Sequence, residues 1–201
     1  MAHKVICIDR ECGSGGHIIG EIVAKELGIS YYDKNLLEIA GQYGGISLET
    51  LKHADEKATN PFYYKQLYEG NENVKKGHPA NETLFHLQRD VIRKIAAKED
   101  CVIVGRCADV ILQNQNISIV NVFIYSPLET RIRREMANDH LSHKQAIALI
   151  RRVDKKRMNY YRYFTKREWG NPHTYDLTLN SGSLGLEKCV SILCDYYKNQ
   201  L

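Results

Sequence analysis

A glycine-rich turn stands between an apolar run at residues 5–8 and an amphipathic repeat that begins at Ile18. The run predicts a buried strand, and the repeat predicts a helix through about Leu27. Glycines let backbone N–H groups approach a ligand closely, and a helix N-terminus carries partial positive charge. A strand, a glycine-rich turn and a helix in this order are therefore typical of a phosphate-binding loop.

The residues of this turn depart from the usual motif, G-x-x-x-x-G-K-[ST]. In that motif the lysine reaches the β- and γ-phosphates and the following hydroxyl ligates Mg²⁺. Here Arg10 stands at the first glycine, Gly16 at the lysine and His17 at the hydroxyl residue. Loss of a cation at the transition state costs a factor of about 10² or more in rate. We expect the missing charge to come from Arg10, from another arginine or from protonated His17.

Length and composition favour one soluble domain. The chain has 201 residues, 43% of them hydrophobic and 26% charged, which suits a single α/β domain with a small inserted lobe. No apolar run approaches the roughly 20 residues that span a bilayer, and the first residues lead straight into a strand rather than a signal peptide. The six cysteines lack C-x-x-C spacing, which predicts reduced thiols in a cytoplasmic protein and no zinc site.

Positive charge is concentrated in one segment. Residues 128–170 contain twelve Lys or Arg against five Asp or Glu, a net charge of +7, whereas the whole chain carries +4. A cationic region on a near-neutral body indicates an anionic ligand, either a phosphorylated small molecule or a nucleic acid.

Four further apolar runs predict strands at residues 29–32, 101–104, 117–124 and 176–179, and helical patterns are interspersed among them. Strands that alternate with helices predict a five-stranded parallel sheet covered on both faces. Arg106 follows the strand at 101–104, at the edge where ligands of such sheets bind. The loop-rich, aromatic segment at 59–80 predicts either a mobile substrate lobe or a surface excursion that packs on the core.

These motifs, in this order, resemble the cytidylate kinase-like family, a branch of the P-loop nucleoside monophosphate kinases. The resemblance covers essentially the whole chain. It implies a single domain, 1–201, built as a three-layer α/β sandwich with a five-stranded parallel sheet, an acceptor-binding insertion at about 42–98 and a helical lid at about 131–170. The residues that carry it are 10–16, 28–33, 102–106, Arg131 with Arg134, Asp154-x-x-Arg157, 175–177 and Asn180-Ser181.

The resemblance also implies an activity, transfer of the γ-phosphoryl group of ATP, with Mg²⁺ held mainly by phosphates and water, to a nucleoside monophosphate. CMP as the acceptor follows from the family name alone. The implied donor-phosphate contacts are Arg10, Gly13, Ser14, Gly15, Gly16 and His17, and the implied adenine loop is Asn180 and Ser181. Acceptor contacts would be Asp33, Lys34, Arg106 and Asp109, with Asp109 either binding the acceptor or orienting Arg106. Catalytic roles would fall to Arg106, Arg131, Arg152, Asp154 and Arg157, with Asp154 holding Arg157 in its rotamer. No protein metal ligand is implied.

Several alternatives remain open on the sequence. Asp33 would also serve as a helix N-cap, and the basic run at 151–157 would also form a solvated helix face. Trp169 and the tyrosines at 160, 161 and 163 are read as lid packing rather than as a base-stacking platform. The activity itself has two alternatives: a nucleotide or anion sensor without turnover, and, less favoured, a nucleic-acid-binding protein. We expect small-molecule nucleotides and no membrane as partners; the sequence does not determine the oligomeric state.

Overall fold

The computed structural model describes residues 3–45 and 80–199, which fold around one parallel sheet. Its five strands lie in the order β2-β3-β1-β4-β5, and each neighbouring pair is parallel. The predicted five-stranded parallel sheet is therefore confirmed. The strands are β1 (Lys4–Arg10), β2 (Ser30–Tyr32), β3 (Cys101–Val104), β4 (Ser118–Tyr125) and β5 (Leu177–Asn180).

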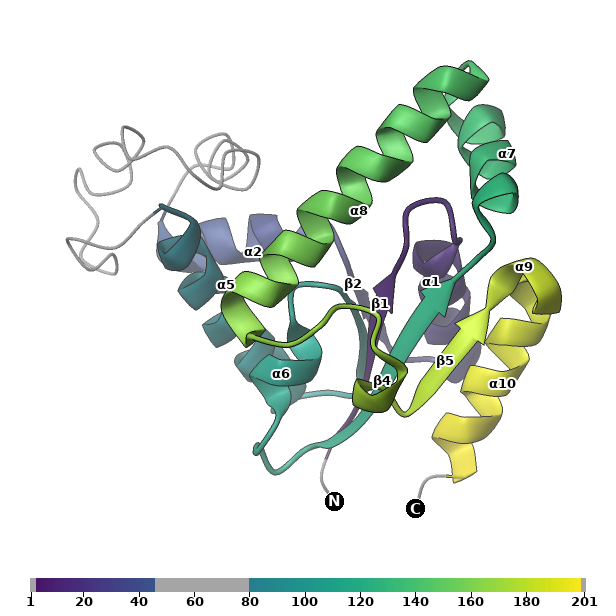
Figure 1. Cartoon of the computed structure of the whole chain (residues 1–201). Helices are drawn as coiled ribbons and strands as arrows, with labels where there is room; N and C mark the ends of the chain where they lie inside the picture. The colour runs from purple at the N-terminus through teal and green to yellow at the C-terminus, as the bar shows by residue number, and fades with distance from the viewer. Residues whose placement is uncertain (1–2, 46–79, 200–201) are drawn as a thin grey trace.

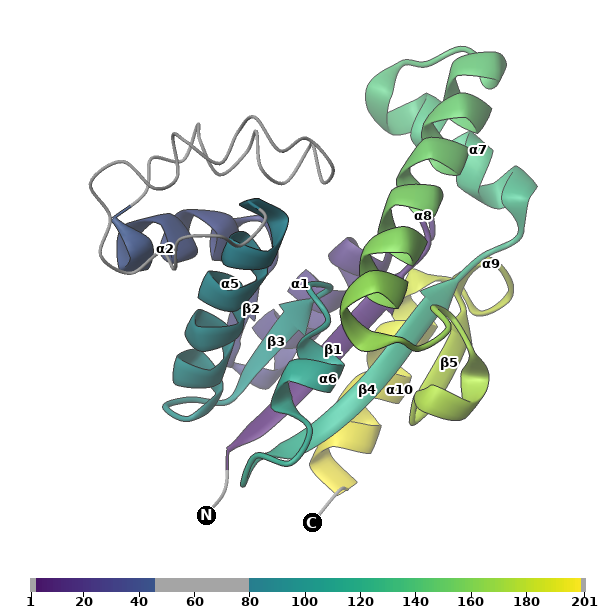
Figure 2. The same ribbon diagram turned by 60° about the vertical axis from the view of Figure 1, so that its left-hand side comes forward.

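Helices cover both faces of the sheet and complete the predicted α/β sandwich (Figures 1 and 2). Side chains alternate along β1, so Ile6 and Ile8 enter one core cluster while Val5 and Cys7 enter the other. The first cluster includes residues of α1 (Gly16–Leu27) and α10 (Leu186–Asn199), and the second includes residues of α2 (Asn35–Gly44), α5 (Ala80–Ala96) and α6 (Ala108–Leu112).

Two helices rise beyond the carboxyl ends of the strands, α7 (Leu128–Asp139) and α8 (His143–Thr165) (Figure 1). They belong to a separate cluster in which Ile132 of α7 packs with Ile150 of α8 and with Cys12 of the glycine-rich turn. Ser142 begins α8 through a capping box with Gln145. The basic segment thus forms a helical pair, α7 and α8, that lies beyond the carboxyl ends of the strands (Figure 1). Two short elements complete the fold, η2 (Pro172–Thr174) and α9 (Ser181–Leu184).

Residues 46–79 lie outside the described part of the chain, and with them most of the predicted insertion at 42–98 and the segment at 59–80. The last part of that insertion is α5, whose Leu87 and Val91 pack in the sheet-covering cluster. The fifth strand begins one residue later than predicted. Asp176 makes a different contact there, because its carboxylate accepts a hydrogen bond from the N–H of Asn121 at 2.7 Å.

All six cysteines are buried as free thiols. Within residues 3–45 and 80–199, no helix combines the length and the apolar character needed to cross a membrane.

Candidate functional site

The glycine-rich turn presents backbone to a ligand. Gly13 and Gly15 have left-handed φ angles of 74° and 81°, which side chains rarely adopt. Gly15 is also the N-cap of α1 and leaves that helix without a side-chain cap. The first N–H groups of a helix have no partner within the helix, so the end of α1 is available to an anion. This geometry fits the donor-phosphate cradle expected at Gly13, Ser14, Gly15, Gly16 and His17.

Arg134 holds the turn from behind. Its guanidinium donates to the carbonyl oxygens of Gly13 at 3.2 Å and Ser14 at 2.8 Å, and to Ser181 Oγ at 3.0 Å. Ser181 in turn donates to the Ser14 carbonyl at 2.5 Å. Because Arg134 and Ser181 bind the carbonyl oxygens of the turn, its N–H groups can point to the opposite side, toward a ligand. In the sequence Arg134 carried only the family resemblance, and the structure gives it this positioning contact.

Replacing Arg134 with alanine is expected to lower the free energy of unfolding by about 2–4 kcal/mol, because several charge-assisted hydrogen bonds are lost and carbonyls are left unpaired. That loss corresponds to a melting temperature lower by about 5–10 °C for a domain of this size. Thermal unfolding followed by circular dichroism measures it. Arg133→Ala removes an exposed arginine from the same helix and serves as the control. Equal melting temperatures for the two variants would show that the hydrogen bonds of Arg134 to the turn do not stabilise the fold.

The helical pair is anchored to the turn by a second set of contacts. Arg131 pairs with Asp154 at 2.5 Å and with Glu11 at 3.4 Å. The Asp154 carboxylate also accepts the N–H of Cys12 at 2.7 Å. Sequence reasoning expected Asp154 to hold Arg157, but the structure pairs it with Arg131 instead. Arg157 donates to the carbonyl oxygen of Arg10 at 2.9 Å.

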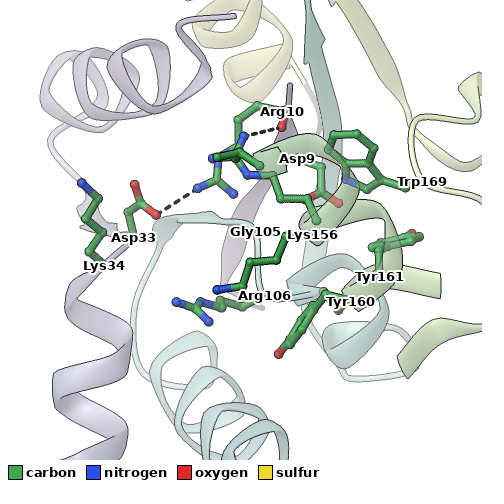
Figure 3. Close-up of a pocket in the computed structure, with 13 residues that line it drawn as sticks. Asp9, Arg10, Asp33, Lys34, Gly105, Arg106, Lys156, Tyr160, Tyr161 and Trp169 are labelled. Atoms are coloured by element: carbon green, nitrogen blue, oxygen red, sulfur yellow. Dashed lines mark hydrogen bonds and ion pairs between the residues drawn. The ribbon is translucent and has the colours of Figure 1, made fainter. Parts of the chain in front are cut away.

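A cavity of about 340 Å³ opens beside the turn, between the strand ends and α8. Its cationic side chains outnumber its carboxylates by five to two, and three aromatic rings, those of Tyr160, Tyr161 and Trp169, face it as well. Figure 3 shows these groups converging from the ends of β1 and β2, the turn after β3, α8, and, for Trp169, the segment after α8. The cations are Arg10, Lys34, Arg106, Lys156 and Arg157, and the carboxylates are Asp9 and Asp33.

The cavity wall beyond β3 has an unusual backbone. Gly105, Arg106 and Cys107 have consecutive positive φ angles of 76°, 61° and 56°. For the two residues with side chains this conformation is costly, and such strain concentrates at functional sites. This left-handed turn places Arg106 in the cavity wall. The sequence predicted a ligand contact for Arg106 because it follows a strand.

Asp33 lies at the cavity beside Arg10, with 3.3 Å between its Oδ1 and the Nη2 of Arg10. Lys34, not Asp33, is the N-cap residue of α2. His17 presents an exposed side chain at the start of α1. Partial desolvation by the atoms packed around its ring, together with the charges of Arg10 and Lys34, lowers the pKa of its imidazole. A lowered pKa leaves His17 mostly neutral at pH 7, which argues against it as the replacement cation.

Asp109 does not line the cavity among the described residues. Its carboxylate is buried and accepts the Tyr161 hydroxyl at 2.6 Å, so it supports the cavity wall rather than Arg106. Asp9, at the end of β1, faces the cavity and accepts the Tyr175 hydroxyl at 3.2 Å. Burial and the nearby charge of Asp109 raise the pKa of Asp9 to about 7. The floor of the cavity therefore holds a carboxyl group that titrates near neutral pH.

Asp9→Asn is expected to raise the free energy of unfolding by up to about 4 kcal/mol at pH 8. The folded pKa of Asp9 lies above the ordinary value, so the native state binds more protons than the unfolded state between about pH 4 and 7. Wild-type stability therefore falls as the pH rises through that window, and the variant escapes this loss. Urea unfolding at pH 4 and pH 8 measures the difference. A gain of equal size at both pH values would contradict ionisation of Asp9 as its cause.

Other predicted residues lie away from the cavity. Arg152 is exposed on α8 and is absent from the described cavity wall. The Asn180 side chain caps α9 by accepting the N–H groups of Gly182 and Ser183. With Ser181 bound to the turn, Asn180 and Ser181 form the wall behind the donor cradle, and a contact with adenine stays a prediction.

Sequence reasoning did not select eight of the cavity residues for the site, among them Asp9, Lys156, Tyr160 and Tyr161. A signal existed for Asp9, since it is the charged residue that directly follows the apolar run at 5–8. For those on α8 the signal is helical spacing: the cavity residues of α8 recur at intervals of three and four and so share one face of the helix. They are Val153, Lys156, Arg157, Tyr160 and Tyr161. Trp169 was interpreted as packing; it makes an edge contact with Phe123 at 5.2 Å between ring centroids and also lines the cavity.

Comparisons with known proteins agree with this fold. The model of the cytidylate kinase-like family matches residues 5–183. The chain is similar to the structure of an uncharacterized protein from Eubacterium ventriosum, with 26% identity, a TM-score of 0.73, and coverage of 98% of this chain and 100% of that one.

Two kinase structures share the fold at lower identity. A shikimate kinase from Bacteroides thetaiotaomicron has 15% identity and a TM-score of 0.55, with 96% of this chain and 98% of that one covered. The Mycobacterium tuberculosis APS kinase, in complex with AMPPNP and APS, has 15% identity and a TM-score of 0.54, with 98% and 99% covered. No curated protein matches the chain.

Proposed function

The chain belongs to the cytidylate kinase-like family, and on that premise we propose that it transfers the γ-phosphoryl group of ATP to a nucleoside monophosphate. The donor phosphates would lie on the Gly13–His17 backbone at the N-terminus of α1. The acceptor would lie in the cavity between Asp33, Arg106 and α8. The two sites meet at Arg10, which ends β1 and lines the cavity.

One observation carries this proposal: five cationic side chains surround a small cavity directly beside an uncapped helix N-terminus. Phosphoryl transfer needs little covalent chemistry from the protein. It needs both reactants held in line and positive charge around the oxygens of the transferring group. The cavity supplies that charge, and the turn supplies the N–H groups.

The cavity suits an acceptor that combines a phosphate with a base. Arg106 and Arg157 present planar guanidinium groups, which bind phosphate oxygens in pairs. Tyr160, Tyr161 and Trp169 provide aromatic surface for a ring. Cytosine as the base rests on the family alone.

Mg²⁺ fits this site as an ion carried by the nucleotide. His17 replaces the hydroxyl that ligates the metal in ordinary P-loops, and the Ser14 hydroxyl already donates to the Glu11 carbonyl at 2.8 Å. The turn therefore offers no side-chain ligand of the usual kind, and phosphates and water would hold the ion. When bound, Mg²⁺ would neutralise part of the charge on the donor phosphates. Arg10, Arg106 and Arg157 would then orient the acceptor and the transferring group.

A panel assay tests the proposal. The protein is incubated with ATP, Mg²⁺ and one nucleoside monophosphate at a time, and ADP release is followed with a coupled enzyme system. We expect one monophosphate, CMP first, to raise the rate of ADP formation above the rate in its absence. If MgATP binds and no acceptor on the panel raises the rate, the sensor alternative replaces the kinase.

A further inference from the structure

The side chain of Arg10 takes the space that position 16 would need for a side chain of its own. A Cβ atom placed on Gly16 would lie 2.5 Å from Arg10 Cβ and 2.9 Å from Arg10 Cγ. Real Cβ atoms essentially never approach so closely, and the Cβ of Arg10 is fixed by the backbone of β1. The next neighbour, Ile124 Cβ, is 3.4 Å away and makes an ordinary contact. Arg10 alone therefore forces glycine at position 16.

The far end of the same side chain lies in the cavity. The Arg10 guanidinium passes over Gly105, where a Cβ would collide with Nη1. From there Nη2 reaches Asp33 (Figure 3). Arg10 thus contacts two glycines: its Cβ and Cγ lie against Gly16, and its guanidinium lies against Gly105. A side chain at either glycine would collide with Arg10.

The guanidinium of Arg10 has fewer hydrogen-bond acceptors and less negative charge around it than a buried cation requires. Its Nε is buried and has no hydrogen-bond acceptor in the described part of the chain. Burial and the nearby charges of Arg157 and Arg106 lower the pKa of Arg10 to about 10, and Asp33 offsets only part of this. At neutral pH Arg10 is still charged. A partly desolvated cation among like charges favours an anion with several oxygens.

We propose that Arg10 is a catalytic residue that replaces the P-loop lysine, with its charge moved from position 16 to position 10 of the same turn. This rests on the proposed function. In the reaction, the bond between the γ-phosphorus and the oxygen that bridges it to ADP breaks, and ADP keeps that electron pair. A bond forms from an oxygen of the acceptor phosphate, which is already ionised, so no proton moves. Arg10 balances the charge on the transferring group.

A sign reversal tests the steric half of this proposal. Gly16→Ala is expected to destabilise the wild-type protein, because its Cβ meets that of Arg10. In an Arg10→Gly background the same change should stabilise, since Gly16 has a backbone conformation open to alanine and alanine lowers the conformational entropy of the unfolded chain. In an Arg10→Ala background the Cβ remains, so Gly16→Ala should still destabilise. Urea unfolding measures the free energy of unfolding of each variant. If Gly16→Ala changes it equally in all three backgrounds, the Cβ of residue 10 does not exclude a side chain from position 16.

Moving the cationic side chain from position 10 to position 16 tests whether Arg10 does the work of the P-loop lysine. Arg10→Gly is expected to weaken MgATP binding, measured by calorimetry, about 10-fold and to lower turnover about 10²-fold or more. Arg10→Gly/Gly16→Lys restores the first glycine and the lysine of the ordinary motif and should recover most of both. Arg10→Gly/Gly16→Met adds a long side chain without charge and should recover neither. Full MgATP affinity in Arg10→Gly, or no recovery in a folded Lys variant, would overturn the proposal.

These readouts separate the inference from the proposed function. Acceptor-dependent turnover of the wild-type protein tests the function. MgATP affinity and unfolding free energies test the role of Arg10, and they do so even if no acceptor is phosphorylated.

Discussion

Replacing Arg106 with alanine is expected to lower acceptor-dependent turnover by about 10²–10³-fold. Arg106 lines the cavity from the strained turn after β3, and a planar guanidinium at that edge is suited to bind the acceptor phosphate and to balance the charge of the transition state. Alanine keeps the left-handed φ that arginine already has at this position, so the backbone cost is unchanged. The free energy of unfolding should therefore change by less than about 1 kcal/mol.

Steady-state kinetics with saturating MgATP and a varied acceptor measure this effect. Arg106→Lys keeps the charge and loses the planar fork, so its rate should lie between those of the wild type and the alanine variant. Arg133→Ala removes an exposed arginine outside the cavity and should change nothing. An unchanged rate for Arg106→Ala would remove Arg106 from the site.

Arg131→Leu is expected to lower the free energy of unfolding by about 3 kcal/mol or more. Arg131 is buried between the carboxylates of Asp154 and Glu11, and its removal leaves two acidic groups without their cation. Asp154 and Arg131 also connect α8 and α7 to the glycine-rich turn, so MgATP affinity should fall with stability. Urea unfolding and calorimetry measure the two effects.

A double-mutant cycle identifies the cause. Arg131→Leu/Asp154→Leu removes one of the two unbalanced carboxylates and leaves only that of Glu11, so the double variant should be less destabilised than the sum of the single variants. Strict additivity would show that the pair is not coupled, and the loss would then reflect packing alone.

The sheet was largely predictable because buried parallel strands read as short apolar runs. Residues 101–104 and the run at 117–124 were recognised in this way, and the alternating helices fixed their parallel direction. Strand ends were less certain. Asp176 looks like part of β5 in the sequence, but its hydrogen bonds to the backbone of Asn121 form a contact just before the strand.

The site was predictable where it depends on strand ends and not where it depends on partners distant in sequence. Arg106 and Asp33 follow strands and do reach the cavity. The pairing of Arg131 with Asp154 needs α7 and α8 to pack together, which no local pattern specifies. Arg152 shares the basic run with Arg157, yet lies on the exposed side of α8.

The position of Arg10 combines both situations. The sequence shows that arginine and glycine stand at unusual positions of one motif. Only the three-dimensional path of the side chain, beneath α1 and over Gly105, shows that the two departures depend on each other.

Phosphorus-31 NMR tests the central claim most directly. The protein is mixed with ATP, Mg²⁺ and CMP, then with each other nucleoside monophosphate in turn, and the spectrum is followed with time. We predict that the β-phosphorus signal of a new nucleoside diphosphate grows in step with ADP, and that it is lost in Arg106→Ala. Release of inorganic phosphate alone, or unchanged ATP with every acceptor although MgATP is bound, would contradict phosphoryl transfer as the function of this site.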